Sequence, residues 1–168
     1  IFYHLWGDFH AVQLRPLFCN PLARNVDAIR TRHANQHIPM ITGALKCYEA
    51  GADTYYYRIA RNFWHTIQGR YRYAMGGVGN GEMFRLPYTQ MLSMANNPEP
   101  TLNETCCAYN LAKLTKDLNC FNPDDASYMD YYERLLYNQL VGSINPHQYH
   151  VLYQYAVGLD ASKPWGNE

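Results

Sequence analysis

Hydrophobic side chains recur at helical spacing in four separate segments of this chain. The first segment, at about residues 35–50, carries them at Ile38, Ile41, Ala44, Leu45 and Tyr48. The segments at about 54–71, 105–119 and 126–144 repeat this spacing. Apolar residues three or four positions apart share one face of a helix. The pattern therefore predicts four amphipathic helices, each with one buried face.

Capping residues set the expected ends of these helices. Asp53 stands directly before the second segment, where its carboxylate can accept a hydrogen bond from a backbone N–H of the first turn. Gly51 is expected just after the first helix, in the position that often takes a left-handed conformation. Pro39 is tolerated only in a first turn, because proline has no backbone N–H. Asn103 or Thr105 can cap the third helix.

The two ends of the chain carry other patterns. Residues 1–17 are rich in aromatic residues and histidine, and we interpret them as the end of a helix. Residues 16–27 contain two prolines and indicate a connection. Residues 148–159 alternate, which predicts a strand, although Leu152 interrupts the pattern. The residues expected on one face of that strand are Tyr149, Val151, Tyr153, Tyr155 and Val157.

Helices of about 15 residues without alternating strands predict an all-α fold built from helix hairpins, with a strand near the C-terminal end. No repeat signature of the tetratricopeptide or HEAT kind is present, which disfavours a regular solenoid. A chain of 168 residues suffices for one domain or for part of a larger one. Since the closing residues 163–168 resemble a loop, we interpret residues 1–168 as an excerpt of one domain. Such an excerpt is expected to be marginally stable.

Charge and composition exclude several classes of function. The chain carries 14 basic and 14 acidic residues, and no basic run, which argues against nucleic-acid binding. Its apolar runs are much shorter than the roughly 20 residues of a membrane-spanning helix, and no signal peptide is visible. The five cysteines are an odd number, which argues against a fully paired disulfide framework.

A glycine-rich loop is the first candidate for chemistry. Four glycines fall between positions 76 and 81, and Glu82 follows them directly. Glycines let the backbone adopt left-handed conformations or approach other groups closely. A glutamate after such a loop is commonly a solvated surface residue, and a carboxylate held at a site is the alternative.

Glu104 and Cys106 form the second candidate. A carboxylate and a thiolate together suit zinc. The alternative is that Glu104 merely favours a helix start through the helix dipole and that Cys106 is a buried thiol. Cys107 is expected to point elsewhere, because adjacent helical side chains lie about 100° apart.

Four blocks of sequence together resemble the β-L-arabinofuranosidases of glycoside hydrolase family 127. The first is His33–Pro39 (His-Ala-Asn-Gln-His-Ile-Pro), and the second is Gly79–Phe84 (Gly-Asn-Gly-Glu-Met-Phe). The third is Glu104–Asn110, with Glu-Thr-Cys followed by Tyr-Asn, and the fourth is Asp130–Asn138 (Asp-Tyr-Tyr-Glu-Arg-Leu-Leu-Tyr-Asn). The blocks occur in the family's order and span most of the chain.

This resemblance implies an (α/α)6 barrel of six helix hairpins, of which the chain would supply somewhat under half. It also implies a retaining, exo-acting glycosidase that acts on an arabinose-containing glycan. Glu82 corresponds to the family's general acid/base, a role that needs a carboxyl able to protonate the departing sugar oxygen. His33 corresponds to a residue that faces the sugar, and Tyr155 is a further substrate-binding candidate.

The resemblance further implies that Glu104 and Cys106 bind Zn²⁺. In the family, a later cysteine pair supplies the other ligands, and one of that pair is the nucleophile. Only Cys120 follows Cys107 in this chain. Zinc is therefore expected to bind weakly or not at all to these residues alone, and the remainder of the parent polypeptide is an expected partner.

Some alternatives stay open at this stage. His33 and His37 are spaced by four residues, a spacing that can bind a metal on one helical face. Because no third ligand accompanies them, we favour the interpretation that they are hydrogen-bonded histidines near a helix start. The family usually has glutamine where this chain has His37, so His37 receives no role. The rival function is a non-catalytic helical module that binds carbohydrate or protein. The sequence does not assign a compartment; a periplasmic or extracellular location suits a polysaccharide-degrading enzyme.

Overall fold

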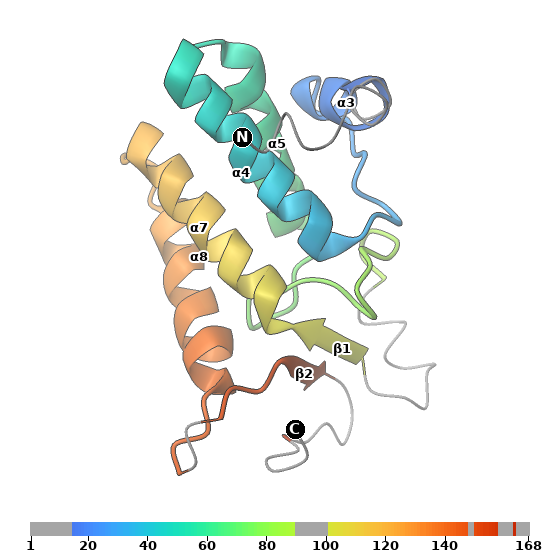
Figure 1. Cartoon of the computed structure of the whole chain (residues 1–168), viewed down its shortest axis with the longest axis vertical. Helices are drawn as coiled ribbons and strands as arrows, with labels where there is room; N and C mark the ends of the chain where they lie inside the picture. Colours follow the sequence, from blue (N-terminus) through green and yellow to red (C-terminus); the bar gives the residue numbers. More distant parts are fainter. Residues whose placement is uncertain (1–14, 90–100, 148–149, 158–162, 164–168) are drawn as a thin grey trace.

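A computed structural model describes residues 15–89, 101–147, 150–157 and 163, apart from the side chains of Arg15, Thr101, Leu102 and Tyr155. The described part consists mainly of two helix hairpins packed side by side (Figure 1). The first hairpin is α4 (Ala34–Gly51) and α5 (Thr54–Arg70). The second is α7 (Thr105–Phe121) and α8 (Ser127–Leu135), and α7 packs against α4. The expected all-α class is confirmed.

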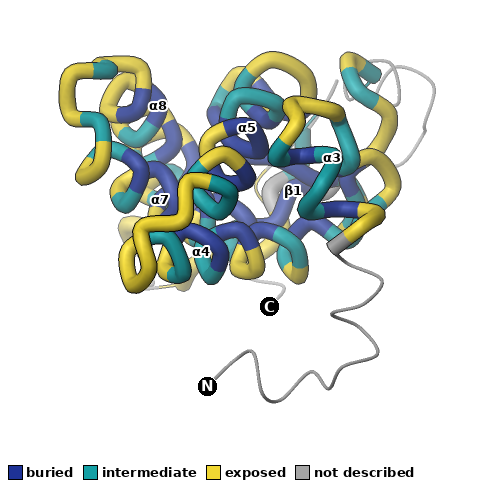
Figure 2. Tube along the Cα trace, turned by 90° about the horizontal axis from the view of Figure 1, so that it is seen from above, coloured by how far each residue is buried: buried dark blue, intermediate teal, exposed yellow. Residues whose placement is uncertain are grey.

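The predicted apolar faces meet between the hairpins. Figure 2 shows buried positions along the facing sides of the helices and exposed positions on their outer sides. The fully buried side chains include Ile38, Leu45, Ile59, Phe63, Ile67, Leu111, Leu114, Leu118, Tyr128 and Leu135. Trp64 joins the two hairpins: its ring centroid lies 4.6 Å from that of Tyr128, and its Nε1 donates to Thr115 Oγ1 at 2.9 Å.

Of three predictions about helix boundaries and proline placement, one is confirmed and two are wrong. Asp53 caps α5 as expected, by accepting from the backbone N of Tyr55 at 2.9 Å. Gly51 does not end α4 in a left-handed conformation, because Ala52 takes that conformation with φ of 55°. Pro39 lies inside α4, beyond the first turn, because the helix begins at Ala34. It cannot supply an N–H to the carbonyl of Asn35.

The predicted fourth helix, 126–144, is helical but not uniform. After α8 the chain widens into a π-helix, η2 (Leu136–Leu140), and then tightens into a 3₁₀ turn, η3 (Val141–Ser143). The helix ends at Ser143, before Pro146, because Ile144 is extended. A π-turn contains one more residue per bonded ring than an α-turn, so it changes which side chains face inward.

The predicted connection at 16–27 is partly wrong. Residues Arg15–Cys19 form the π-helix η1, and Asn20–Ala23 form the short helix α3, which packs on α5. Pro21 lies near the start of α3, where proline is tolerated. The helix interpretation of residues 1–17 lies outside the described residues for all but its last three positions.

The C-terminal strand exists but is shorter than predicted. Strand β2 (Gln154–Val157) pairs antiparallel with β1 (Thr101–Glu104), with Asn103 opposite Tyr155. Just before β2 the exposure alternates: Val151 is 56% exposed and Tyr153 48% exposed, whereas Leu152 between them is 3% exposed. Leu152 also donates its backbone N–H to Ser143 O at 2.7 Å. Tyr149 lies outside the described residues.

Two broader expectations also bear on the fold. The five cysteines all lie in the described part, and no disulfide joins them. None of the described helices is both long and apolar enough to cross a membrane.

Candidate active site and metal centre

The glycine loop begins where α5 ends, at the same end of the hairpins as β1 (Figure 1). Gly76, Gly79 and Gly81 have φ of 111°, 91° and 54°, so the loop uses the left-handed freedom that glycine provides. Tyr73 holds the loop from inside: its hydroxyl donates to Gly79 O at 3.0 Å, and its backbone N–H donates to Gly77 O at 2.9 Å. The loop is therefore an ordered turn with defined bonds.

Glu82 lies where this loop is fastened to the start of α4. Its backbone O accepts from the N–H of Ala34 at 2.8 Å, and Phe84 N donates to Arg32 O at 2.8 Å. Glu82 itself has φ of 66°, an uncommon conformation for a residue with a side chain. Its side chain is 64% exposed. The carboxylate thus stands in solvent on a backbone that is fixed on both sides.

His33 faces Glu82 from the N-terminus of α4. Its Nε2 lies 3.7 Å from Glu82 Oε2, and its Nδ1 accepts from the backbone N of Gln36 at 3.4 Å, as the N-cap of the helix. His37, one turn further, contacts His33 O through Nδ1 at 2.8 Å, and burial lowers the pKa of its imidazole. The interpretation of both histidines as hydrogen-bonded residues near a helix start is confirmed, and the structure also brings His33 to Glu82.

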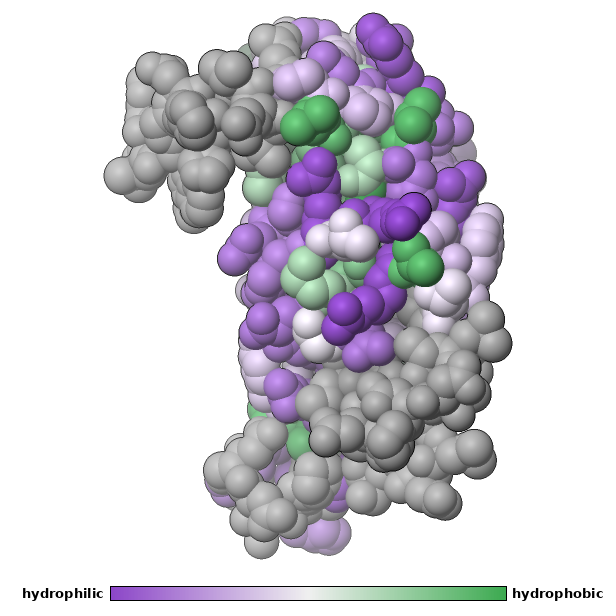
Figure 3. All heavy atoms as spheres, turned by 90° about the vertical axis from the view of Figure 1, so that its right-hand side faces the viewer, coloured by the Kyte–Doolittle hydropathy of each residue, from purple (hydrophilic) through white to green (hydrophobic). Residues whose placement is uncertain are grey.

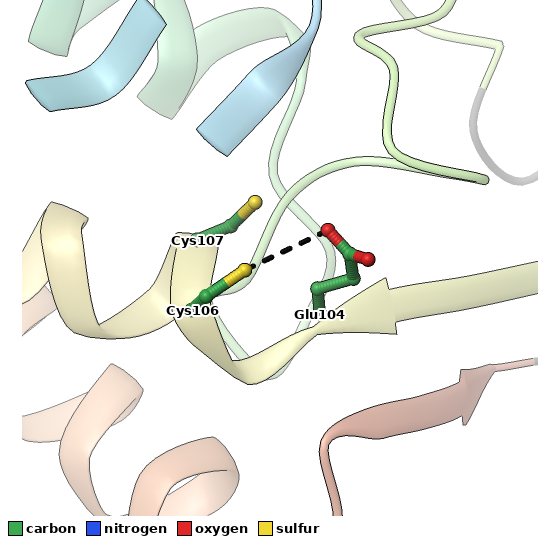
Figure 4. Close-up of side chains that lie close together, drawn as sticks. All are labelled: Glu104, Cys106 and Cys107. Carbon is green, nitrogen blue, oxygen red and sulfur yellow. Dashed lines mark hydrogen bonds between the residues drawn. The ribbon is translucent and has the colours of Figure 1, made fainter. Parts of the chain in front are cut away.

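The second group of donor atoms lies where β1 passes into α7. Glu104, Cys106 and Cys107 each offer one ligand atom, and these atoms all lie within 4.8 Å of one another (Figure 4). The expectation that Cys107 points elsewhere is therefore wrong. Helical side chains tilt toward the N-terminus, so two successive sulfur atoms in a first turn can both reach the carboxylate that precedes it.

Two hydrogen bonds favour the thiolate of Cys106. The neighbouring Cys107 thiol, followed by the Tyr153 hydroxyl, lowers the pKa of Cys106 to about 7, although burial and Glu104 oppose this. Tyr153 donates to Cys106 Sγ at 3.1 Å. The same hydrogen bond to Cys106, together with burial, raises the pKa of Cys107. Cys106 is therefore the more acidic thiol of the two, and the thiolate is the form of cysteine that binds metals and acts as a nucleophile.

The donor set fits zinc in part. Glu104 is 5% exposed, and among the described residues no cationic side chain forms an ion pair with it. Its contact within the group is the 3.6 Å hydrogen bond from Cys106 Sγ. A buried carboxylate without a cationic side chain beside two thiols suits a divalent cation. Zinc takes four ligands, or three and solvent, so these three residues leave one position to another donor.

The two groups lie at one end of the hairpins and are connected across the helices. Figure 1 shows the N-terminal ends of α4 and α7 meeting near β1. Asn110 on α7 donates through Nδ2 to Asn35 Oδ1 on α4 at 2.8 Å. The structure brings His33 to within 3.7 Å of Glu82 and Cys106 to within 3.6 Å of Glu104. Tyr155 lies in β2, but its side chain lies outside the described residues.

Sequence reasoning missed three residues of this region: Cys107, Tyr153 and Gln139. The alternating pattern assigns Tyr153 only to packing on a strand. Gln139 is fully buried in η2 although it is polar. It lies four residues after Leu135, at the spacing of the apolar face, and a polar residue at such a position is a signal that could have identified it.

A hollow elsewhere on the surface contains none of these candidates. It is lined by residues of α3 and the segment that follows, among them Pro21, Asp27 and Thr31. On the face that Figure 3 shows, hydrophobic residues are scattered among hydrophilic ones. Neither feature matches the acid and thiol chemistry at the ends of α4 and α7.

Comparisons with known proteins identify the fold and the family of the chain. The solved structure of a GH127 beta-arabinofuranosidase, BT3674, matches 92% of this chain with a TM-score of 0.65 and 22% sequence identity. The match covers 26% of that protein's chain, so this chain spans about a quarter of its length. No curated protein matches the chain. The family model for the beta-L-arabinofuranosidase GH127 catalytic domain matches residues 9–167. The chain therefore belongs to the GH127 β-L-arabinofuranosidase catalytic-domain family.

Proposed function

We propose that the complete protein is a retaining, exo-acting glycosidase that cleaves β-L-arabinofuranosidic bonds in an arabinose-containing glycan. Family membership supports the reaction class. The observation that carries the proposal is the fixed position of Glu82: a solvent-facing carboxylate on a backbone bonded at Ala34 and flanked by the bond from Phe84 to Arg32. A general acid needs such placement, because proton transfer requires hydrogen-bond reach to the substrate oxygen.

Glu82 acts as the general acid and then as the general base in this proposal. The acid form protonates the leaving sugar oxygen, and the carboxylate then accepts a proton from the water that completes hydrolysis. His33, at 3.7 Å from this carboxylate, faces the sugar beside it. Tyr155 is proposed to contact the sugar from β2.

Glu104 and Cys106 are the proposed zinc ligands. We add Cys107 as a third donor, because its sulfur lies close to the other two ligand atoms. Bound zinc would stabilise thiolate charge at this centre and hold a cysteine nucleophile in its deprotonated form. The nucleophile is proposed to come from another part of the parent polypeptide, as does the remaining ligand. The low pKa of Cys106 makes it the first residue here to offer a sulfur anion.

Substitution of Glu82 by glutamine tests the proposal. In the complete protein, E82Q should keep the fold and lower kcat by about 10²–10⁴-fold on an arabinofuranoside with a sugar leaving group, because general acid–base catalysis contributes that much. Glu133→Gln is the matched control, since Glu133 is an exposed glutamate on α8.

Turnover by E82Q equal to that of the wild type would remove Glu82 from the mechanism. If the wild-type protein binds arabinose-containing glycans without cleaving them, the proposal fails in favour of a carbohydrate-binding module.

A further inference from the structure

We propose that Asn103 and Gln139 are a positioning pair that holds the glycine loop and Glu104 in register. Neither residue touches a candidate substrate position. The pair acts through its neighbours: Asn103 precedes Glu104 in β1, and Gln139 belongs to η2. An effect of the pair on zinc binding rests on the proposed function. An effect of the pair on the order of the glycine loop and of β1 does not.

The two amides form a reciprocal hydrogen-bonded pair in the interior. Asn103 Nδ2 donates to Gln139 Oε1 at 3.2 Å, and Gln139 Nε2 donates to Asn103 Oδ1 at 3.1 Å. Both residues are completely buried. Gln139 Nε2 also approaches the backbone O of Glu104 at 3.5 Å. Because a buried amide is costly unless it is satisfied, each amide strongly restricts the position of the other.

Gln139 takes part because it continues the buried face of α8. It lies four residues after the buried Leu135, at helical spacing, and it is buried in η2. This part of the helix is a π-turn, and π-turns are frequent at functional sites. The buried face here presents an amide to the end of β1.

The glycine loop packs directly on this amide pair. A Cβ atom placed on Gly77 would overlap Gln139 Oε1 and Asn103 Nδ2, so the backbone at Gly77 lies against both amides. Two further contacts fasten the same part of the loop. Tyr131 donates through its hydroxyl to Gly76 O at 2.8 Å, and Asn103 Nδ2 lies 3.6 Å from Met75 Sδ. The Asn103–Gln139 pair thus contacts both the loop that ends at Glu82 and the strand that ends at Glu104.

The test removes both amides while it keeps their volume. The double variant N103L/Q139M replaces each side chain by an apolar one of similar size, and losing both partners together can be nearly neutral for stability. Its melting temperature should stay within a few degrees of the wild type. The single variant Asn103→Leu leaves Gln139 unpaired and should melt clearly lower.

Hydrogen exchange of the complete protein provides the first readout. Peptides that cover residues 76–84 and 101–107 should both exchange about tenfold faster in N103L/Q139M, while α4 and α5 keep their protection. Thr115→Val is the matched control, because it removes the buried hydrogen bond between Trp64 on α5 and Thr115 on α7, and neither residue belongs to the loop. Unchanged exchange of either peptide in the double variant would overturn the proposal.

Zinc affinity provides the second readout. The double variant should bind zinc about 10–100-fold more weakly in a chelator competition, as outer-layer substitutions at metal sites do, and T115V should not. Faster exchange of both peptides with unchanged zinc affinity would overturn the link between the pair and the metal. A wild-type protein that binds no zinc would refute the zinc centre of the proposed function, and hydrogen exchange would still decide the positioning role.

Discussion

Gly77 is the glycine of this loop at which an added Cβ would meet its neighbours most closely. Its φ is not left-handed, so conformational freedom does not explain it. The lack of space explains why glycine is needed here, because the Asn103 and Gln139 amides occupy the volume that a side chain would need. Gly69 offers the opposite case: it lies near the end of α5, and a methyl group at its Cβ position would have nothing within 4 Å.

The first prediction compares these two glycines. Gly77→Ala should lower the free energy of unfolding by about 1–3 kcal/mol or more, because overpacking displaces the amides. Gly69→Ala should raise it by about 0.5–1 kcal/mol, because alanine favours a helix over glycine. Urea denaturation of both variants measures the difference. Equal stability of the two variants would contradict the close approach at Gly77.

The second prediction concerns Cys106 in the complete protein. Zinc bound at Glu104 and Cys106 should protect the Cys106 sulfur from alkylation, and a chelator should restore the reaction, because a coordinated thiolate is not available to the reagent. Mass spectrometry of labelled peptides measures the rates. Cys120, an exposed cysteine outside the cluster, is the control and should react alike in both conditions. Equal rates for Cys106 with and without chelator would exclude it as a ligand.

At the scale of elements, the left-handed residue after α4 is alanine, and the glycine lies one position before it, inside the helix. Gly51 is the last residue of the helix, and Ala52 takes the left-handed conformation with φ of 55°. Glycine costs stability in a helix, and alanine costs stability in a left-handed turn. The two residues therefore occupy each other's preferred positions.

The third prediction exchanges them. The double variant G51A/A52G should raise the free energy of unfolding by about 1–2 kcal/mol, from a better helix residue and a relaxed helix end together. The two sites are adjacent, so the single variants should be measured as well. A double variant less stable than the wild type would show that the helix end is set by contacts other than these backbone preferences.

At the scale of the whole molecule, two hairpins place an acid and a thiol group at one end. Three donors of a zinc-thiolate centre are proposed to lie in these residues, from Glu104, Cys106 and Cys107. The five cysteines include no second adjacent pair. The family's later cysteine pair would complete the ligand set and provide the nucleophile.

The fourth prediction follows from the absence of a second adjacent cysteine pair in these 168 residues. The isolated 168-residue chain should hydrolyse no arabinofuranoside, even with zinc added, whereas the complete protein should do so. Release of arabinose from the same substrate under the same conditions measures both. Activity of the purified 168-residue chain, retained after repeated purification and lost in E82Q, would show that the nucleophile lies within these residues.

The sequence alone determined the four apolar faces, the Asp53 cap and the residues that resemble the family's blocks. These features are local: helical spacing depends on residues three or four apart, and a cap bonds within its own first turn. Glu82 and Glu104 could be selected as candidates for the same reason, because each stands inside a short block of distinctive residues.

Only the tertiary structure decided which distant residues meet. The pairing of β1 with β2 places Asn103 opposite Tyr155, far along the chain, and no local pattern carries that register. The bond from the Leu152 N–H to Ser143 O joins two segments, and the pairing of Gln139 with Asn103 joins η2 to β1, a contact that helical periodicity does not predict. The Cys107 sulfur joins the metal group because β1 delivers Glu104 to the first turn of α7. Such contacts arise from packing between elements, which fixes positions that the preferences of single segments leave open.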